Sequence, residues 1–440
     1  MNLAPPLKVR KLQETLQAKA KGAPTYRFYA LYDKIYRADV LGYAYACCQA
    51  NGGAAGVDGQ TFEDIEAYGC QRWVGELAEA LRQKTYRPQA VRRVYIPKPD
   101  GKQRPLGIPT VTDRVVQMAT LVVLGPIFEA DLQPEQYAYR EGRSALEAVR
   151  RVQRLLIEGH TEVVDADLSG YFDSIPHAEL MKSVARRVSD GQLLALIKRW
   201  LEAPVEESDE RGHVQRTTRN KDEGRGTPQG APLSPLLANL YMRRFILGWK
   251  RLGHERVLDA HIVNYADDFV ICCRGTAEKA CAVMRDMMAR LRLTVNEQKT
   301  RVCTVDEPFN FLGYTIGRLY APRTGNSYIG VKPSAKKIQG LCREIRAHTE
   351  RRWFWLSPAD LVTRLNRCVR GWANYFCLGT ITKAYRHVTA YMRHRVRQWL
   401  VRKYKLQGSK RSRFSYHYLH ETLGLLWLRR PPNRFLWVNA

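Results

Sequence analysis

One segment of the chain, residues 261–272, places two adjacent carboxylates between two apolar runs. Asp267 and Asp268 follow β-forming residues and precede the run Phe-Val-Ile-Cys. Aspartate is poor in strand interiors and common in turns, so the pattern predicts a strand, a tight turn and a second strand. Two like charges side by side are unfavourable unless a cation lies beside them. The segment therefore predicts a divalent-metal site at a hairpin tip, with an ordinary Asp-Asp turn as the alternative that these residues alone leave open.

A third carboxylate elsewhere in the sequence fits the same site. Asp167 follows an apolar run just as Asp267 does, so the two are expected at adjacent strand ends of one sheet. Proteins commonly bind Mg²⁺ through two or three carboxylates together with substrate phosphates and water. We interpret Asp167 and Asp267 as the principal ligands and Asp268 as the supporting one. Asp165 shares a strand face with Asp167 and Asp173 follows closely, and the alternation of residues does not separate Asp165 from Asp167.

The charge of the chain indicates a polyanionic partner. Its 440 residues carry a formal net charge of +28, and 45% of them are hydrophobic, which is ordinary for a folded protein. Residues 331–440 hold 24 Lys and Arg against 4 Asp and Glu, a net charge of +20. The final quarter is therefore expected to bind nucleic acid, whereas a basic helical surface without a partner is the alternative.

The cysteines and the apolar runs bear on the cellular compartment. The ten cysteines are scattered and none forms a Cys-x-x-Cys pair, so neither a zinc module nor a disulfide framework is predicted. No continuous apolar run reaches membrane-spanning length, and no signal-peptide core is present, so no membrane partner is expected. We expect a cytoplasmic, nucleoid-associated protein of a bacterium; the basic first 36 residues leave an organelle transit peptide open.

The pattern of apolar residues, glycines and prolines predicts the order of elements. We expect a basic helical lead-in over residues 1–50, helices over 62–84, 113–128, 145–158, 178–203, 233–250 and 276–291, a hairpin over 91–108, a strand from 162, a loop or hairpin over 206–226, a β-like segment at 311–314, and basic amphipathic helices beyond 332. Ser357 is predicted to cap a helix that has Pro358 in its first turn and ends at Gly379.

Several motifs resemble those of a known family. Tyr-Ala-Asp-Asp at 265–268, Asp-Leu-Ser-Gly-Tyr-Phe-Asp at 167–173 and Gly-Thr-Pro-Gln-Gly-Ala-Pro-Leu-Ser-Pro-Leu-Leu-Ala-Asn at 226–239 occur in the order typical of reverse transcriptases. The longest motif, with residues 96–109 and 139–144, closely resembles group II intron-encoded proteins. Residues 371–376 resemble the maturase segment of that family. The resemblance covers nearly the whole chain, from residue 55 to residue 376.

This resemblance implies an α+β fold and a division into parts. It implies a right-hand polymerase, with fingers and a palm built on an antiparallel sheet, followed by an α-helical thumb or maturase domain. The implied parts are an N-terminal extension over 1–60, fingers and palm over 61–330, the thumb over 331–405 and a basic C-terminal segment over 406–440.

The resemblance also assigns roles to individual residues. It separates Asp167 from its neighbouring acids and makes Asp167, Asp267 and Asp268 catalytic ligands of Mg²⁺, with Mn²⁺ as a possible substitute. The implied nucleotide-binding residues are Lys98, Arg104, Phe172, Gln229 and Lys299; Lys98 and Arg104 would contact the triphosphate and Phe172 would exclude a 2′-hydroxyl. The implied primer grip consists of Phe311, Leu312, Gly313 and Tyr314. The implied RNA-binding residues are Arg364, Arg367, Arg370, Lys383, Arg386, Arg393 and Arg397.

The function that follows is RNA-directed DNA polymerase of a group II intron, a retroelement, which adds nucleotides by two-metal catalysis and binds intron RNA to assist splicing and mobility. The expected partners are intron and template RNA, a DNA primer or target, and dNTPs. A splicing maturase without polymerase activity is one alternative, although the three aspartates with Lys98, Arg104 and Gln229 argue against it. A related polymerase recruited to defence or repair is another. The sequence shows no His and Cys cluster after residue 405, so we expect no metal-dependent endonuclease.

Overall fold

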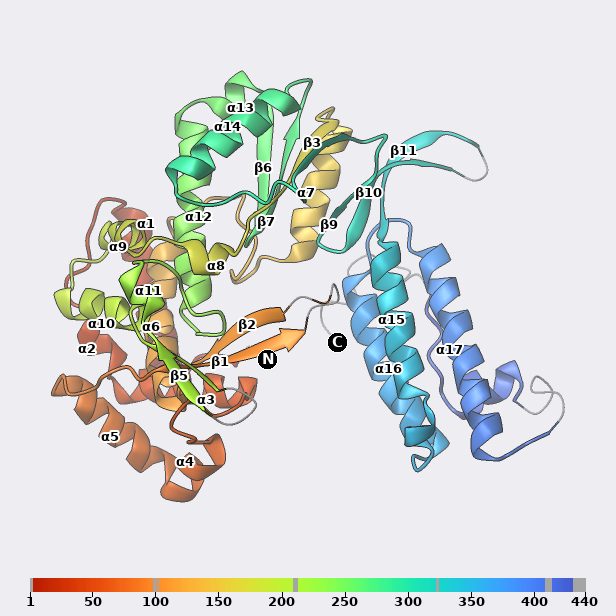
Figure 1. Ribbon diagram of the computed structural model, residues 1–440, viewed down its shortest axis with the longest axis horizontal. Coiled ribbons are helices and arrows are strands. Elements are labelled where there is room, and N and C mark those ends of the chain that lie inside the picture. Colours follow the sequence, from red (N-terminus) through yellow and green to blue (C-terminus); the bar gives the residue numbers. More distant parts are fainter. Residues whose placement is uncertain are drawn as a thin grey trace. The chain divides into compact units, whose positions relative to one another are not determined.

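The computed structural model describes residues 3–97, 101, 103–208, 213–321, 324–407 and 414–429, which form two compact units (Figure 1). The first unit contains Met1–Ser144, Ala166–Phe269 and Glu278–Arg301, and the second contains Ala145–Asp165, Val270–Ala277 and Val302–Ala440. Helices and largely antiparallel sheets are mixed along the chain, as the α+β prediction requires.

The predicted helical lead-in over residues 1–50 is present as the first three of five N-terminal helices. They are α1 (Leu7–Gly22), α2 (Tyr32–Ile35), α3 (Ala38–Asn51), α4 (Phe62–Tyr68) and α5 (Cys70–Arg82). The prediction of one helix over 62–84 is wrong, because Gly69 adopts φ 104° and separates α4 from α5. A glycine can take this conformation without steric penalty, and its N–H bonds back to the carbonyls of Ile65 and Glu66 to close the first helix.

Helix α6 (Val111–Glu129) is the central helix of this unit and packs against α1 and α3. It is the one helix within the described ranges whose length and composition would allow it to cross a membrane, and most of its residues are buried in the protein. Its buried Asp113 accepts hydrogen bonds from the hydroxyls of Tyr86 and Thr110. An apolar helix with internally satisfied polar groups fits the core of a folded unit.

The predicted hairpin at 91–108 is confirmed and belongs to a larger sheet. Strand β1 (Val91–Pro97) pairs antiparallel with β2 (Gln103–Ile108) and parallel with β4 (Val205–Ser208). Strand β5 (Val214–Thr217) pairs antiparallel with β4, so the segment 206–226 contains a hairpin rather than only a loop. The predicted nucleotide-binding residue Lys98 falls between β1 and β2 in the sequence and lies outside the described residues.

The predicted helix over 178–203 is two helices. These are α9 (His177–Ala185) and α10 (Gly191–Leu201). Asp190 caps α10, because its Oδ1 accepts hydrogen bonds from the backbone N–H groups at the start of that helix. Its Oδ2 also accepts the N–H groups of Leu31 and Tyr32 at 2.8 Å, so this break is fixed by a segment distant in sequence.

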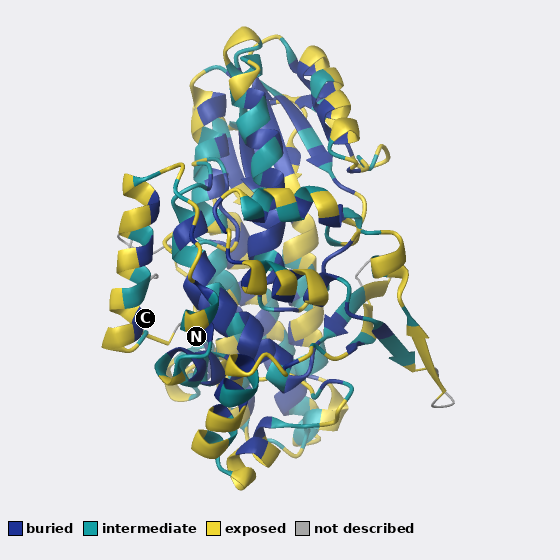
Figure 2. Cartoon of the chain, turned by 90° about the vertical axis from the view of Figure 1, so that its left-hand side faces the viewer, coloured by how far each residue is buried: buried dark blue, intermediate teal, exposed yellow. Residues whose placement is uncertain are grey.

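A four-stranded sheet carries the acidic motifs. Its order is β6 (Ala260–Tyr265), β7 (Asp268–Cys273), β3 (Glu162–Asp167) and β8 (Arg301–Thr304). The strands are largely buried, whereas the surrounding helices show one buried and one exposed face (Figure 2). The predicted helices are present as α7 (Ala145–Ile157), α12 (Ser234–Arg251) and α14 (Ala277–Arg290), with the short α13 (His254–Val257) before β6.

A second antiparallel sheet lies within the second unit. It consists of β9 (Phe309–Phe311), β10 (Tyr314–Tyr320) and β11 (Ser327–Pro333) in the order β11-β10-β9. The predicted β-like segment at 311–314 is the turn that joins β9 to β10. Leu312 and Gly313 have φ values of 49° and 82°, so only the two ends of the segment are extended.

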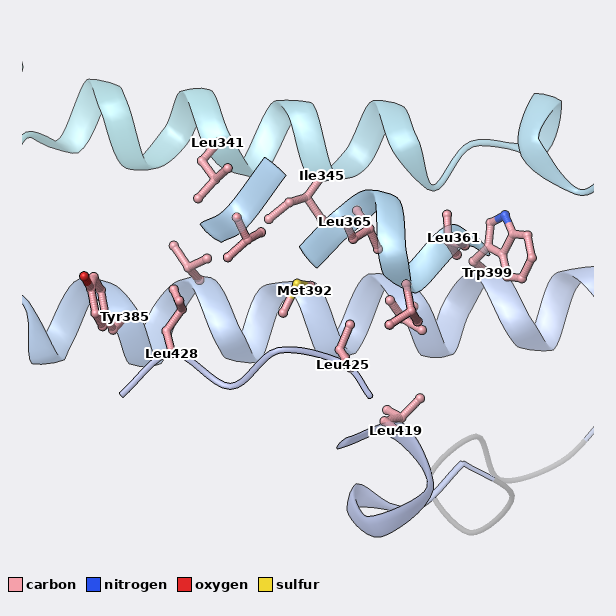
Figure 3. Packing of buried hydrophobic residues seen from close by; sticks show 14 of the residues in the cluster. Leu341, Ile345, Leu361, Leu365, Tyr385, Met392, Trp399, Leu419, Leu425 and Leu428 are labelled. Atoms are coloured by element: carbon pink, nitrogen blue, oxygen red, sulfur yellow. The ribbon is translucent and has the colours of Figure 1, made fainter. Parts of the chain in front are cut away.

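The C-terminal helices form a bundle around one apolar cluster, as the amphipathic pattern predicts. Helices α15 (Ala335–His348), α16 (Pro358–Tyr375) and α17 (Thr382–Lys403) direct Leu341, Ile345, Leu361, Leu365, Met392 and Trp399 toward one another (Figure 3). Leu419, Leu425 and Leu428, from the chain at and after η2 (Tyr418–Thr422), complete the cluster (Figure 3). The short 3-10 helix η1 (Arg351–Trp353) links α15 to α16.

The start of α16 is confirmed and its predicted end is wrong. The Ser357 hydroxyl accepts the N–H of Asp360, and Pro358 occupies the first turn. The helix ends at Tyr375, before Gly379. A Cβ at Gly379 would lie 2.0 Å from the Val331 carbonyl oxygen, so this glycine permits close approach to β11 instead of ending the helix.

Candidate active site

The Asp267–Asp268 turn is held by a buried asparagine. Strand β6 ends at Tyr265 and β7 begins at Asp268, which leaves Ala266 in the left-handed region with φ 58°. The fully buried Asn264 donates from Nδ2 to the Ala266 carbonyl at 2.8 Å. A non-glycine residue in this conformation carries a strain of roughly 1–2 kcal/mol, which the asparagine bond helps to offset. The predicted strand-turn-strand is confirmed, and its tip is structurally fixed.

Asp167 ends β3, the strand next to β7, and has two side-chain partners. Its Oδ2 accepts hydrogen bonds from Lys299 Nζ at 3.0 Å and Asn296 Nδ2 at 3.1 Å. Its backbone N–H donates to Thr300 Oγ1 at 3.3 Å and its carbonyl accepts the Asn296 N–H at 2.8 Å. The segment after α14 therefore fixes Asp167 and brings Lys299, which composition alone would leave as a solvated lysine, to the acidic site.

The electrostatics of Asp267 connect these groups. Burial raises the pKa of Asp267 above its ordinary value, and the negative charge of Asp167 raises it further. The backbone N–H of Asp267 and the cations Arg104 and Lys299 act in the opposite direction. The predicted residues from four separate segments thus lie within electrostatic reach of one another.

The donor set fits a hard divalent cation. The carboxylates of Asp167 and Asp267 provide the oxygen ligands that Mg²⁺ prefers, and the charge of Asp167 disfavours the ionised form of Asp267. The oxygens of Asp167, Asp267 and Asp268 do not all lie within 4.8 Å of one another, although all three residues are described. A Mg²⁺ ion held by Asp167 and Asp267 would complete its shell with water and substrate phosphates.

The turn with Phe172 is connected to the hairpin of β1 and β2 through the Gly-rich motif at 226–239. Helix α8 (Tyr171–Ser174) follows Asp167, and the Phe172 carbonyl accepts the Thr227 N–H at 2.7 Å. Two residues later, the Gln229 carbonyl accepts the Gly107 N–H at 2.6 Å. The motif therefore bridges α8 and β2, and positions the half-buried Phe172 and Gln229 in the same unit as the aspartates.

Gly230 shows why the motif needs glycine. It has φ 113°, and a Cβ there would lie 2.6 Å from the Gly107 carbonyl oxygen. Any side chain would displace β2, the strand that carries Arg104, from the motif.

Two neighbours of the site were not among the predicted residues. Tyr139 is 56% exposed with φ 56°, and burial of its hydroxyl together with the charge of Asp267 raises its pKa. Asn296 binds Asp167 directly. Tyr139 begins the motif at 139–144 and Asn296 lies three residues before Lys299, but only the fold shows that these two residues lie near the acids. Asp173, by contrast, has Arg93 as its opposing charge.

The predicted primer-grip residues lie in the second unit. Phe311 and Tyr314 are buried, and the Tyr314 hydroxyl donates to the Tyr375 carbonyl. The Tyr375 hydroxyl donates to the Leu312 carbonyl at 2.8 Å, so the turn is fixed to the end of α16.

The seven predicted RNA-binding residues divide into two groups. Arg367, Arg370, Lys383 and Arg386 are exposed. Arg364 stacks over Trp353 at 3.9 Å, Arg393 lies 5.6 Å from the Tyr416 ring, and Arg397 Nε donates to the Phe414 carbonyl at 2.8 Å. Among the described residues, the first group forms none of these ring or carbonyl contacts, whereas the second group also supports the bundle.

Comparison with known proteins shows which families the chain resembles. Residues 96–316 match the family described as reverse transcriptase (RNA-dependent DNA polymerase), and residues 338–418 match the group II intron maturase-specific domain. Protein YkfC of Escherichia coli is 31% identical over 354 residues, which cover 70% of this chain and 88% of that protein. The group II intron-encoded protein LtrA of Lactococcus lactis is 28% identical over 352 residues, and the match covers 66% of this chain and 57% of LtrA. A putative COX1/OXI3 intron 1 protein of Saccharomyces cerevisiae is 26% identical over 59% of this chain and 36% of that protein.

The chain belongs to the reverse transcriptase family. Within that family it joins a reverse transcriptase domain to a group II intron maturase-specific domain, as the sequence motifs predict. Its relatives include intron-encoded proteins of bacteria and of yeast.

Proposed function

We propose that this chain is an active RNA-directed DNA polymerase that works with a group II intron RNA. The observation that carries the proposal is that Asp267 lies within electrostatic reach of Asp167, Arg104 and Lys299, and that Lys299 bonds directly to Asp167. Such a set handles metal ions and phosphates and has no purpose in a protein that only binds RNA. In this proposal residues 61–330 form fingers and palm, 331–405 the thumb, 1–60 the N-terminal extension and 406–440 the basic C-terminal segment.

The proposed roles follow from the contacts. Asp167 and Asp267 would hold Mg²⁺ with support from Asp268, and the metal would supply Lewis-acid activation of the primer 3′-hydroxyl and charge stabilisation for the leaving pyrophosphate. Lys299, which balances Asp167, and Arg104, which faces Asp267, receive triphosphate oxygens. Lys98 and Gln229 extend this nucleotide site. Extension of a DNA primer on an RNA template with dNTPs and Mg²⁺ tests the proposal.

Phe172→Ala is expected to admit ribonucleotides. The ring is half-buried beside the Asp167 turn, so shortening the side chain opens space for a 2′-hydroxyl. We expect the ratio of kcat/KM for dNTP to that for rNTP to fall roughly 10- to 100-fold. Phe172→Tyr keeps the ring and should keep the discrimination. An unchanged ratio in Phe172→Ala would show that another group excludes the ribose hydroxyl.

Lys299→Met is expected to lower kcat about 100-fold, because it removes a positioned cation from the site of developing charge. The same change frees Asp167 Oδ2 of its 3.0 Å bond, so the Mg²⁺ concentration for half-maximal rate should fall. Steady-state rates over a Mg²⁺ titration measure both effects, and Lys299→Arg should restore part of kcat. A higher KM with unchanged kcat would contradict a role in the chemical step.

The maturase part of the proposal rests on the helical bundle. Arg367, Arg370, Lys383 and Arg386 offer exposed cations for phosphates, and their contribution should weaken as salt rises. The proposed partners are the intron RNA, an RNA template, a DNA primer or target, and dNTPs.

A further inference from the structure

A cavity of about 210 Å³ opens between α9 and α12 in the first unit. This volume is several times the roughly 30 Å³ that one water molecule occupies in the liquid. The cavity is lined by Lys182, Arg186, Arg243 and Arg244, with Glu179 and Ser183. It involves none of the residues assigned above to metal, nucleotide, primer or RNA.

Arg243 is the cation in this cavity that forms no ion pair within the described residues, although the charge of Asp131 acts on it at longer range. Its Nε donates to the Asp131 carbonyl at 2.7 Å, and no carboxylate in the described parts of the chain forms an ion pair with it. Burial lowers the pKa of Arg243 to about 10, and the neighbouring Arg186 contributes to the shift. A half-buried guanidinium without a carboxylate is unfavourable for folding, so the protein gains from an anion at this position.

The nearby carboxylates are already occupied. The Asp131 carboxylate forms ion pairs with both Arg186 and the fully buried Arg187. The Glu179 carboxylate accepts hydrogen bonds from Lys182 Nζ and from Arg244 Nη1, each at 2.8 Å. These contacts hold the pKa of Glu179 at about 2, so this acid stays ionised. The five cations Lys182, Arg186, Arg187, Arg243 and Arg244 face these two carboxylates, which leaves a formal charge of +3.

We propose that this cavity is a phosphate-binding pocket. Arginine presents a planar fork of donors that matches phosphate oxygens. A phosphate group supplies the negative charge that the two carboxylates leave unbalanced. The group can belong to an RNA backbone, in which case the inference rests on the proposed function, or to a free phosphate compound; the pocket chemistry is the same for both.

The pocket itself is tested by thermal unfolding. The Tm is measured in inorganic phosphate and in pyrophosphate, with chloride at equal ionic strength as the reference. Both anions should raise the Tm of the wild type by more than that of Arg243→Met, because the ligand binds only the folded pocket. Phosphate also stabilises proteins because it is excluded from their surfaces, and this contribution to the rise in Tm is the same for all variants. Arg290→Met removes one exposed cation of the same unit and should respond as the wild type does.

Arg243→Met should also be at least as stable as the wild type without phosphate, because it removes an unpaired buried charge. If this variant does not fold, Lys182→Met, at a side chain 72% exposed, takes its place in the titration. An equal response of wild type and pocket variants to phosphate and pyrophosphate would overturn the proposal.

RNA binding over a range of salt concentrations identifies the source of the phosphate. If the pocket holds an RNA phosphodiester, Arg243→Met should weaken binding about tenfold and reduce the salt slope by about one, whereas Arg290→Met changes neither. A pocket-dependent phosphate response with unchanged RNA binding assigns the pocket to free phosphate compounds. The unfolding experiment needs no polymerase activity, so its outcome stands even if primer extension fails.

Discussion

Asp267→Asn should abolish DNA synthesis and leave the affinity for RNA nearly unchanged. The substitution keeps the size of a side chain that the fold holds at the tip between β6 and β7, but it removes the charge that we propose binds the metal ion. Loss of a metal ligand removes several kcal/mol of transition-state stabilisation, which corresponds to about a 10³-fold or greater fall in rate. Single-turnover incorporation of one dNTP, together with equilibrium RNA binding, measures the two quantities separately.

The stability of this variant provides an internal check. Because the folded-state pKa of Asp267 lies above its ordinary value, the ionised carboxylate destabilises the metal-free fold as pH rises through that pKa. Asparagine removes the destabilisation caused by the ionised carboxylate, so the variant should have the same Tm as the wild type or a higher one at neutral pH. This difference in Tm should vanish below about pH 4, near the ordinary aspartate pKa. Asp286→Asn, at an exposed carboxylate of α14, serves as the control and should retain full activity. A folded Asp267→Asn protein that no longer binds RNA would contradict the separation of roles.

Leu365→Ala should destabilise the helical bundle by about 3–4 kcal/mol, the middle of the range for a buried leucine. Leu365 is fully buried on α16 among residues of α15 and α17, so its removal leaves a cavity that three helices would have to close (Figure 3). Amide hydrogen exchange should show faster opening of α15, α16 and α17 and little change in α12, because stability is not uniform along a chain of this size. Intron RNA binding should fall with the folded fraction of the bundle.

The matched control for this substitution is Leu7→Ala. Leu7 is 66% exposed at the start of α1, so replacing it with alanine should change the free energy of opening measured by amide exchange by no more than about 0.5 kcal/mol. Unchanged protection of the bundle in Leu365→Ala would show that the cluster does not stabilise these helices.

The sequence predicts those parts of the fold and site that depend on local pattern. The apolar runs before Asp167 and before Asp267 identify β3 and β6 because a buried strand needs such runs. Ser357 and Pro358 identify the start of α16 because capping is a local interaction. The apolar stripe of the C-terminal helices likewise identifies the bundle core.

Features that depend on distant partners could not be predicted in this way. The break at Asp190 involves hydrogen bonds to Leu31 and Tyr32, more than 150 residues away along the chain. The sequence alone indicates a solvated lysine at Lys299, because its partner Asp167 lies at the end of β3, far away in sequence. Arg243 is one of 71 Lys and Arg residues, and only its burial without a carboxylate partner distinguishes it.

Primer extension on an RNA template, with dNTPs and Mg²⁺, tests the central claim most directly. We predict Mg²⁺-dependent DNA synthesis by the wild type, none after chelation, and none by Asp267→Asn. Tight RNA binding by a wild-type protein that extends no primer under any of these conditions would contradict the account and would identify a maturase that only binds RNA.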